Sequence, residues 1–282
     1  MRRVSALFCD LPLAERIERA EARRMADATA LARNRPGSAA FVRPVAGGVA
    51  TFAEAGSPLN KVAGLGFGGV PAADVLDETE RAFAAVGCPA QVELAHLADP
   101  SIAATLTGRG YRLESFENVL GRDLREPPDR VVPPGIEIRP VGPGESGAWL
   151  EASVDGFTQP DTPAEPSAHV FGREVLATAL RDLVAAGDVR RYLAVCDGVV
   201  AGAASMCVTG GLAQFTGAAT LPGHRRRGVQ TALLSARLAD AAAAGCDLAV
   251  VTTAPASKSQ QNAQRRGFQV LYTRAVLVKP AE

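Results

Sequence analysis

Apolar and polar positions in the second half of the chain follow the periods of strands and helices in turn. Residues 136–141 alternate between apolar and polar side chains, which predicts a strand, because successive side chains of a strand point to opposite faces. Between about 228 and 244, Leu233, Leu234 and Leu238 fall on one face of a helix. The predicted order is strand, two helices, three strands, helix, strand, helix and strand. The predicted strands lie near 136–141, 191–196, 199–208, 213–221, 248–253 and 275–278. The predicted helices lie near 145–157, 167–186, 228–244 and around residue 262.

The first half shows a related pattern. Residues 12–35 are rich in Ala, Glu and Arg, which predicts a helix. Residues 41–67 contain short strand-like runs broken by glycines, a pattern typical of antiparallel strands. A helix is predicted for 71–86, because proline is tolerated in the first turn. Two further strands are predicted at 91–94 and around 118–120.

Two short segments recur at nearly the same spacing in both halves. Ala85-Val86-Gly87-Cys88 corresponds to Ala243-Ala244-Gly245-Cys246, and Arg109-Gly110-Tyr111 corresponds to Arg266-Gly267-Phe268. The offsets are 158 residues (245 − 87) and 157 residues (267 − 110). Chance similarity of short segments is the alternative, but the order of the predicted elements matches as well. We therefore predict a duplicated domain.

Residues 125–134 contain paired prolines, which disfavour helix and stiffen the chain, so we interpret them as a linker. The prediction is a domain over 1–124, this linker, and a second domain over 135–282.

Composition excludes several classes of protein. The 282 residues include 30 Lys plus Arg and 30 Asp plus Glu, so the formal net charge is zero. A protein that binds nucleic acid or an anionic membrane needs a basic excess, so we expect neither partner. An apolar fraction of 47% and a charged fraction of 21% indicate a globular chain rather than a disordered one.

Cysteine usage and segment lengths point to a reducing compartment. The five cysteines are odd in number and have no CxxC spacing, and the three histidines lie far apart, so we expect no metal site. The apolar run after Met1-Arg2-Arg3 ends at Asp10, which is too short for a secretory signal. No window approaches the about 18–20 apolar residues of a membrane span. We expect a cytoplasmic protein, monomeric or homodimeric.

The segment from Ala218 to Leu234 carries the clearest chemistry. A predicted strand ends at Leu221, a basic loop with Arg225, Arg226 and Arg227 follows, and a helix begins near Gly228. The first turn of a helix has unpaired N–H groups and a partial positive charge, so this geometry predicts a diphosphate site. We also expect Gly228, which has no side chain, to let a ligand approach the backbone. The segment matches neither a P-loop nor a dinucleotide-binding fingerprint.

This segment resembles the pyrophosphate loop of the GNAT superfamily of acyl-CoA N-acyltransferases. That loop has Arg or Gln, two residues, Gly, one residue, and Gly or Ala; Arg225 and Gly228 match, whereas Gln230 departs from the last position. The resemblance extends over about 135–280 and includes Asn262-Ala263-Gln264-Arg265-Arg266-Gly267-Phe268. It implies an α/β (α+β) fold of two tandem GNAT-like domains, each a mixed, mostly antiparallel central sheet flanked by helices. It also implies acetyl-CoA (CoA) as the cosubstrate.

By this resemblance, the end of the fourth strand faces the pantetheine arm, the loop and first helical turn hold the pyrophosphate, and an amide on the next helix lines the same arm. The implied cofactor-binding residues are Ala219, Thr220, Leu221, Arg225, Arg226, Arg227, Gly228, Val229, Gln230, Thr231, Ala232 and Asn262. The alternatives are a solvated basic turn for the arginines and an ordinary helix-surface amide for Asn262.

The catalytic groups are not identified by the sequence. Many GNAT members carry a tyrosine acid four residues before the Gly of Gly-Phe, and that position here is Ala263. Ser257 and Ser259 are candidates to hydrogen-bond the departing sulfur, and Asp197 is the single carboxylate between Arg190 and Leu221. Direct attack of an amine on a thioester needs no enzyme nucleophile, so we expect the cysteines to be buried apolar residues. Acceptor-pocket candidates, each with ordinary surface or core as the alternative, are Glu151, Asp155, His169, Glu174 and Tyr272.

The first half lacks the basic loop. An offset of 158 residues carries Arg225–Gly228 onto Phe67–Val70, and acidic residues follow in the next helix. Acidic groups near a helix start repel a diphosphate, so we hypothesise that this copy keeps the fold without binding CoA.

The sequence thus predicts an N-acetyltransferase that moves an acetyl (acyl) group from acetyl-CoA to a primary amine of a small molecule or peptide. A non-catalytic acyl-CoA-binding or sensor protein with a GNAT fold is the alternative. A protein that binds nucleotides or nucleic acid is a third hypothesis, which the zero net charge disfavours.

Overall fold

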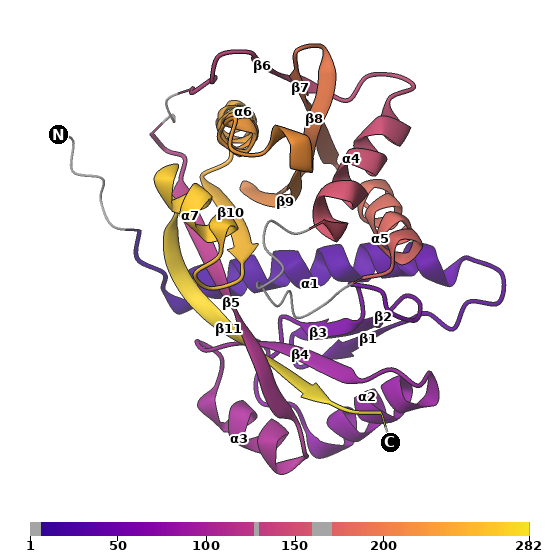
Figure 1. The fold of residues 1–282 in the computed structure, drawn as a ribbon. Helices are drawn as coiled ribbons and strands as arrows, with labels where there is room; N and C mark the ends of the chain where they lie inside the picture. The colour runs from indigo at the N-terminus through magenta and orange to yellow at the C-terminus, as the bar shows by residue number, and fades with distance from the viewer. Residues whose placement is uncertain (1–6, 127–129, 160–170, 282) are drawn as a thin grey trace. The chain divides into compact units, whose positions relative to one another are not determined.

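The structure is a computed structural model that describes residues 7–126, 130–159 and 171–281 (Figure 1). Its contacts divide the chain into two compact units. The described residues of 7–8, 119–173 and 188–271 form what we call the C-terminal unit, and those of 9–118, 174–187 and 272–281 form the N-terminal unit. His169 and residues 127–129 of the predicted linker lie outside the described residues.

The second half of the chain confirms the predicted order of elements, although its second helix and most of its last strand belong to the N-terminal unit. The sheet of the C-terminal unit runs in the order β10-β9-β8-β7-β6; β9 and β10 are parallel, and the other neighbours are antiparallel. The elements are β6 (Ile136–Pro140), α4 (Ser146–Thr158), β7 (Val189–Cys196), β8 (Val199–Thr209), β9 (Leu212–Thr220), the short 3-10 helix η1 (Pro222–His224), α6 (Val229–Ala243), β10 (Leu248–Thr253) and α7 (Lys258–Arg265).

The N-terminal unit also contains a mixed sheet with helices. Strands β1, β2 and β3 are antiparallel neighbours, as predicted, and β3 pairs with β4 in parallel. The sequence interpretation missed the short helix α3. The elements are α1 (Leu11–Arg33), β1 (Phe41–Val45), β2 (Gly48–Phe52), β3 (Lys61–Ala63), α2 (Ala73–Ala85), β4 (Ala90–Ala95), α3 (Pro100–Gly108), and parts of β5 (Arg112–Asp123), α5 (Arg173–Ala185) and β11 (Gln269–Lys279).

The last strand of each half of the chain belongs at least in part to the other unit. Residues 274–279 of β11 pair antiparallel with β4, from Arg274–Ala95 to Lys279–Ala90, inside the N-terminal unit. Residues 119–123 of β5 belong to the C-terminal unit, where β5 neighbours β10. Alternation along a strand sets which side chains are buried but not which strand is its neighbour, so the sequence pattern could not predict this.

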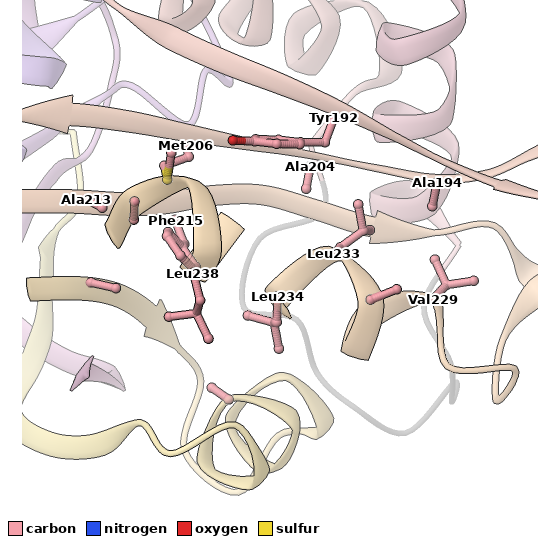
Figure 2. Close-up of a cluster of buried hydrophobic side chains, with 14 of the residues drawn as sticks. Tyr192, Ala194, Ala204, Met206, Ala213, Phe215, Val229, Leu233, Leu234 and Leu238 are labelled. Atoms are coloured by element: carbon pink, nitrogen blue, oxygen red, sulfur yellow. The ribbon is translucent and has the colours of Figure 1, made fainter. Parts of the chain in front are cut away.

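The core of the C-terminal unit explains why α6 forms where the periodicity predicts. Leu233, Leu234 and Leu238 are buried in one cluster with Met206 of β8 and Phe215 of β9, as Figure 2 shows. Burial of such side chains contributes roughly 1.5–3 kcal/mol each, which anchors the helix over the sheet. The helix start and the end of β9 are thereby held on a rigid support.

A cluster of charged side chains is buried in the N-terminal unit. Arg274 of β11 is 3% exposed, and its Nε donates to Glu18 Oε1 of α1 at 2.7 Å. The hydroxyl of Tyr272 donates to the same oxygen at 2.6 Å. On β3 and β4, Lys61 Nζ lies 2.5 Å from Glu93 Oε1. Tyr272 is therefore a core residue of this unit, which is the alternative given for it above.

Glu117 of β5 belongs to the same cluster. Repulsion by Glu93 and burial raise the pKa of Glu117 to about 7, although Lys61 and Arg274 lower it; Glu21 adds a further repulsion. A carboxyl whose pKa is raised by folding stabilises the folded state at low pH. That contribution is lost as pH rises from the ordinary value of 4.5 through about 7.

The Glu117→Gln variant should therefore flatten the pH dependence of stability. We expect it to unfold at a higher temperature than the wild type at about pH 8, and at a similar temperature at about pH 5, because glutamine carries no charge to repel Glu93. Thermal denaturation followed by circular dichroism measures this. Glu114→Gln, on the exposed face of the same strand, is the matched control and should leave the profile unchanged. If the unfolding temperature of Glu117→Gln depended on pH as that of the wild type does, the raised pKa of Glu117 would be refuted.

Candidate functional site

The two parallel strands of the C-terminal unit separate towards their carboxyl ends. Paired positions between β9 and β10 run from Leu212–Leu248 to Gln214–Val250, although β9 continues to Thr220 and β10 to Thr253. The register between β8 and β9 shifts in the same stretch, where Gly217 has a φ of +59°. Beyond the bulge Ala219 and Thr220 pair again with β8, so in the described residues it is the β9 edge towards β10 that is available for other contacts.

The loop after β9 brings a set of unpaired backbone N–H groups to the start of α6. Gly228, with φ +93°, is the residue before the helix, and the first backbone bond runs from Ala232 N–H to Gly228 O at 3.0 Å. In the described part of the chain, the N–H groups from Arg226 to Thr231 donate to no protein acceptor. These are the orphan donors that the sequence predicted, and they remain open for an anion.

The three arginines of the loop differ in burial and in bonding partners. Arg225 is half-buried; its Nε donates to Thr220 O at 3.4 Å, and its Nη2 donates to Gln159 O, so it ties the loop to the strand end. Arg227 is exposed, with Nη2 at 2.7 Å from Asp197 Oδ2 in the β7–β8 turn. Arg226 is exposed and has a φ of +61°. Arg226 and Arg227 are thus the cations that a ligand in solution reaches first.

The reason for a glycine at position 228 differs from our expectation. A Cβ built there would lie 2.9 Å from Pro133 Cγ, so the space is filled by the linker and not left for a ligand. The linker is held beside α6 by a bond from Val131 N–H to Ser235 Oγ at 2.7 Å. The left-handed backbone and the contact with Pro133 together require glycine at this position.

Most of the other predicted residues at the end of β9 and the start of α6 have buried side chains or bonds within the protein. The side chains of Ala219, Val229 and Ala232 are buried, so a ligand meets only backbone groups there, and the Ala232 N–H is already bonded to Gly228 O. The Leu221 N–H is already bonded to Ala201 O at 3.0 Å. Gln230, where the family has Gly or Ala, donates from Nε2 to Thr220 Oγ1 at 3.0 Å, which links the helix start to the strand end.

Comparison with known proteins decides the family of this region. Residues 156–268 match the model of the Acetyltransferase (GNAT) family. We call these matched residues the GNAT domain; of those that the structure describes, all but 174–187 lie in the C-terminal unit. The separated strands, the bulge and the open N–H groups described above all lie inside the matched residues. No curated protein sequence matches the chain.

Solved structures show that the fold of the whole chain is that of tandem GNAT proteins. A GCN5-related N-acetyltransferase from Kribbella flavida is 20% identical, with 93% of this chain and 96% of that chain covered and a TM-score of 0.63. A tandem GNAT protein from the clavulanic acid biosynthesis pathway is 17% identical, with the same coverage and a TM-score of 0.59. A GCN5-related N-acetyltransferase from Sphaerobacter thermophilus is 18% identical over 74% of this chain and 67% of that chain, with a TM-score of 0.57. The predicted fold class is therefore confirmed.

The candidate acid–base residues and Asn262 lie on helix α7 or at its N-cap. Ser257 is the N-cap of α7, where its Oγ accepts from Gln260 N–H at 3.2 Å, and Ser259 is exposed on the same helix. Asn262 of α7 is half-buried, and its side chain makes no hydrogen bond with the residues that the structure describes. Ala263, at the position of the family's tyrosine, is 2% exposed.

The proposed acceptor-pocket residues of α4 and α5 are surface groups. Glu151 and Glu174 are exposed, and Asp155 forms an ion pair with Arg173. Among the described residues, no group of His, Cys, Asp and Glu side chains is placed to hold a metal ion. None of the helices described here is long and apolar enough to cross a membrane.

The N-terminal unit contains a counterpart of the loop in which two amides are already bonded. The N–H groups of Gly66 and Gly68 both donate to Ala46 O, at 3.3 and 3.0 Å. A Cβ at Gly68 would lie 2.6 Å from the backbone nitrogen of Gly47, so the loop packs directly on the β1–β2 turn. The first turn of α2 adds the negative charge of Asp74. This contrast with the GNAT domain supports our hypothesis that the first copy does not bind CoA.

Proposed function

We propose that the GNAT domain is an acyl-CoA-dependent N-acyltransferase that moves an acetyl group from acetyl-CoA to a primary amine of a small molecule or peptide. The observation that carries the proposal is the open set of N–H groups from Arg226 to Thr231, beside the separated ends of β9 and β10. Such a site suits a diphosphate, and a long thioester-bearing arm fits along the edge of β9 that does not pair with β10.

The proposed placement assigns a part of CoA to each element. The diphosphate lies at the N–H groups of α6, where the exposed guanidinium groups of Arg226 and Arg227 add charge-assisted contacts. The pantetheine arm follows the end of β9 around Ala219 and Thr220, within reach of the half-buried Asn262 of α7. The thioester then lies near the β9 bulge.

The reaction needs no covalent enzyme intermediate. The lone pair of a neutral amine attacks the thioester carbon, the C–S bond breaks, the amine loses a proton, and the thiolate gains one. Holding the two reactants together lowers the barrier by up to about 7–11 kcal/mol in favourable cases. The Ser257 hydroxyl keeps its own proton available while its oxygen accepts from Gln260, so it is our candidate donor to the sulfur.

A non-catalytic acyl-CoA-binding protein is the second candidate. It is favoured by the buried Ala263 at the family's tyrosine position and by the ion pair of Asp197 with Arg227, which occupies the single carboxylate between Arg190 and Leu221. Isothermal titration with acetyl-CoA tests both readings. Release of free thiol with a panel of primary amines then separates them, because a sensor binds acetyl-CoA without turnover. No binding of acetyl-CoA would contradict both.

The Cys246→Ala variant should retain turnover. Cys246 is 4% exposed at the end of α6, where it belongs to the apolar core, and direct attack requires no thiol. We expect kcat within about twofold of wild type and a loss of stability of about 1 kcal/mol, as for other small changes in a core. A thiol-release assay at saturating acetyl-CoA measures this. Complete loss of turnover in a folded variant would overturn direct transfer.

The compartment is also a proposal. None of the five cysteines, all of which the structure describes, forms a disulfide, which fits a reducing compartment such as the cytoplasm.

A further inference from the structure

A single arginine is buried behind the β9 bulge of the C-terminal unit. Arg237 of α6 is 1% exposed, and in the described part of the chain it forms no ion pair with a carboxylate. Burial lowers the pKa of its guanidinium to about 10, so it stays charged at neutral pH. An uncompensated buried charge is costly, which means that other contacts must hold it there.

Those contacts are backbone carbonyls on both sides of the bulge. Arg237 Nη1 donates to Ser205 O of β8 at 3.2 Å and to Thr216 O of β9 at 3.5 Å. The guanidinium carbon lies 4.6 Å from the ring centre of Phe215, a favourable cation–π arrangement. The arginine therefore binds the residue just before the bulge and the strand that faces it.

Two more buried donors hold the same region. Ser205 Oγ donates to Thr216 O at 3.1 Å. From α4, Trp149 Nε1 donates to Ala204 O at 3.1 Å, directly opposite the extra residues of β9. The bulge thus has its carbonyls fixed by side chains at places where regular strand pairing is interrupted.

This arrangement sets the direction of one amide. A peptide group is planar and trans, so its N–H points opposite to its C=O. Because Thr216 O points towards Arg237 and Ser205 Oγ, the Gly217 N–H points away from them. We infer that Arg237 is a positioning residue for the acyl site: it fixes the β9 bulge so that the Gly217 N–H is held ready to bond the thioester carbonyl oxygen of acetyl-CoA. The inference rests on the proposed function.

A pair of ligands tests this without knowledge of the acceptor. S-ethyl-CoA has the same diphosphate and pantetheine arm as acetyl-CoA but lacks the thioester carbonyl oxygen. One additional hydrogen bond predicts that wild type binds acetyl-CoA about three- to tenfold more tightly than S-ethyl-CoA in isothermal titration. In Arg237→Met we expect this preference to fall to about onefold, while the Kd for S-ethyl-CoA stays within about twofold of wild type.

Two variants complete the experiment. Tyr192→Phe removes the hydroxyl that donates to Asp240 Oδ2 of α6 at 2.8 Å but keeps every donor to the bulge carbonyls, so it should keep the full preference. Arg237→Lys keeps the charge with a single donor centre and should show a reduced preference; it carries the test if Arg237→Met does not fold.

The outcomes separate the two proposals. An unchanged preference in the Arg237 variants, an equal loss of both ligands, or the same loss in Tyr192→Phe would overturn the positioning role. Equal binding of both ligands by wild type would also overturn it, but would leave CoA binding intact. Failure of wild type to bind either ligand would instead contradict the proposed function.

Discussion

Replacing Gly228 with alanine should weaken CoA binding at least tenfold and lower the free energy of unfolding by about 1–3 kcal/mol. The residue has φ +93°, a conformation that costs any residue with a Cβ, and the new Cβ would lie 2.9 Å from Pro133 Cγ. Relief of that contact must turn the peptide groups at the start of α6. The N–H groups from Arg226 to Thr231 would then no longer converge on one anion.

Gly223→Ala is the matched control for this prediction. Gly223 lies in the same loop, within η1, and a Cβ there would meet nothing within 4 Å. It should leave both CoA affinity and stability unchanged. Isothermal titration and thermal denaturation of both variants measure the difference. Wild-type affinity in Gly228→Ala, or the same loss in Gly223→Ala, would show that the geometry of this helix start does not determine binding.

Replacing Arg274 with methionine should destabilise the protein by about 3–5 kcal/mol, because it leaves buried carboxylates without their cation. Glu18 and Glu93, at 1% and 2% exposure, lie 2.7 and 3.6 Å from the guanidinium nitrogens. Methionine keeps the apolar length of the side chain, so the effect reports the lost charge rather than a cavity. Chemical denaturation gives the free energy of unfolding.

Arg19→Met provides the contrast. Arg19 forms an i,i+4 ion pair with Glu15 at 2.6 Å on the surface of α1, with 64% of its side chain exposed. Its loss should cost less than about 1 kcal/mol. The double variant Glu18→Gln/Arg274→Met should regain part of the stability, since it also removes a stranded charge. If Arg274→Met were no more destabilising than Arg19→Met, the buried cluster would contribute nothing to the fold.

The parts of the site that the sequence predicted are those set by the residues of a single segment. The spacing of Leu233, Leu234 and Leu238 placed α6, and the change from strand to basic loop placed its start within a residue of Gly228. Period and loop composition act over a few residues, so they can be read from the chain alone.

Contacts between distant segments could not be predicted in that way. The packing of Pro133 on Gly228, and the pairing of β11 with β4, depend on which segments meet in space. Arg237 left a signal that we missed: it is a lone charged residue on the apolar face that carries Leu233 and Leu238. A charge at such a position indicates a buried polar role, although its partners, the carbonyls around the bulge, appear only in the fold.

The central claim is that the open N–H groups at the start of α6 bind the diphosphate of CoA. Amide NMR of the isotope-labelled full chain, titrated with CoA, observes those groups directly. We predict that the resonances of residues 226–231 shift in proportion to saturation, while the amides of Gly66 and Gly68, already bonded to Ala46 O, stay in place. Unchanged resonances at 226–231 in the presence of saturating CoA would contradict the account.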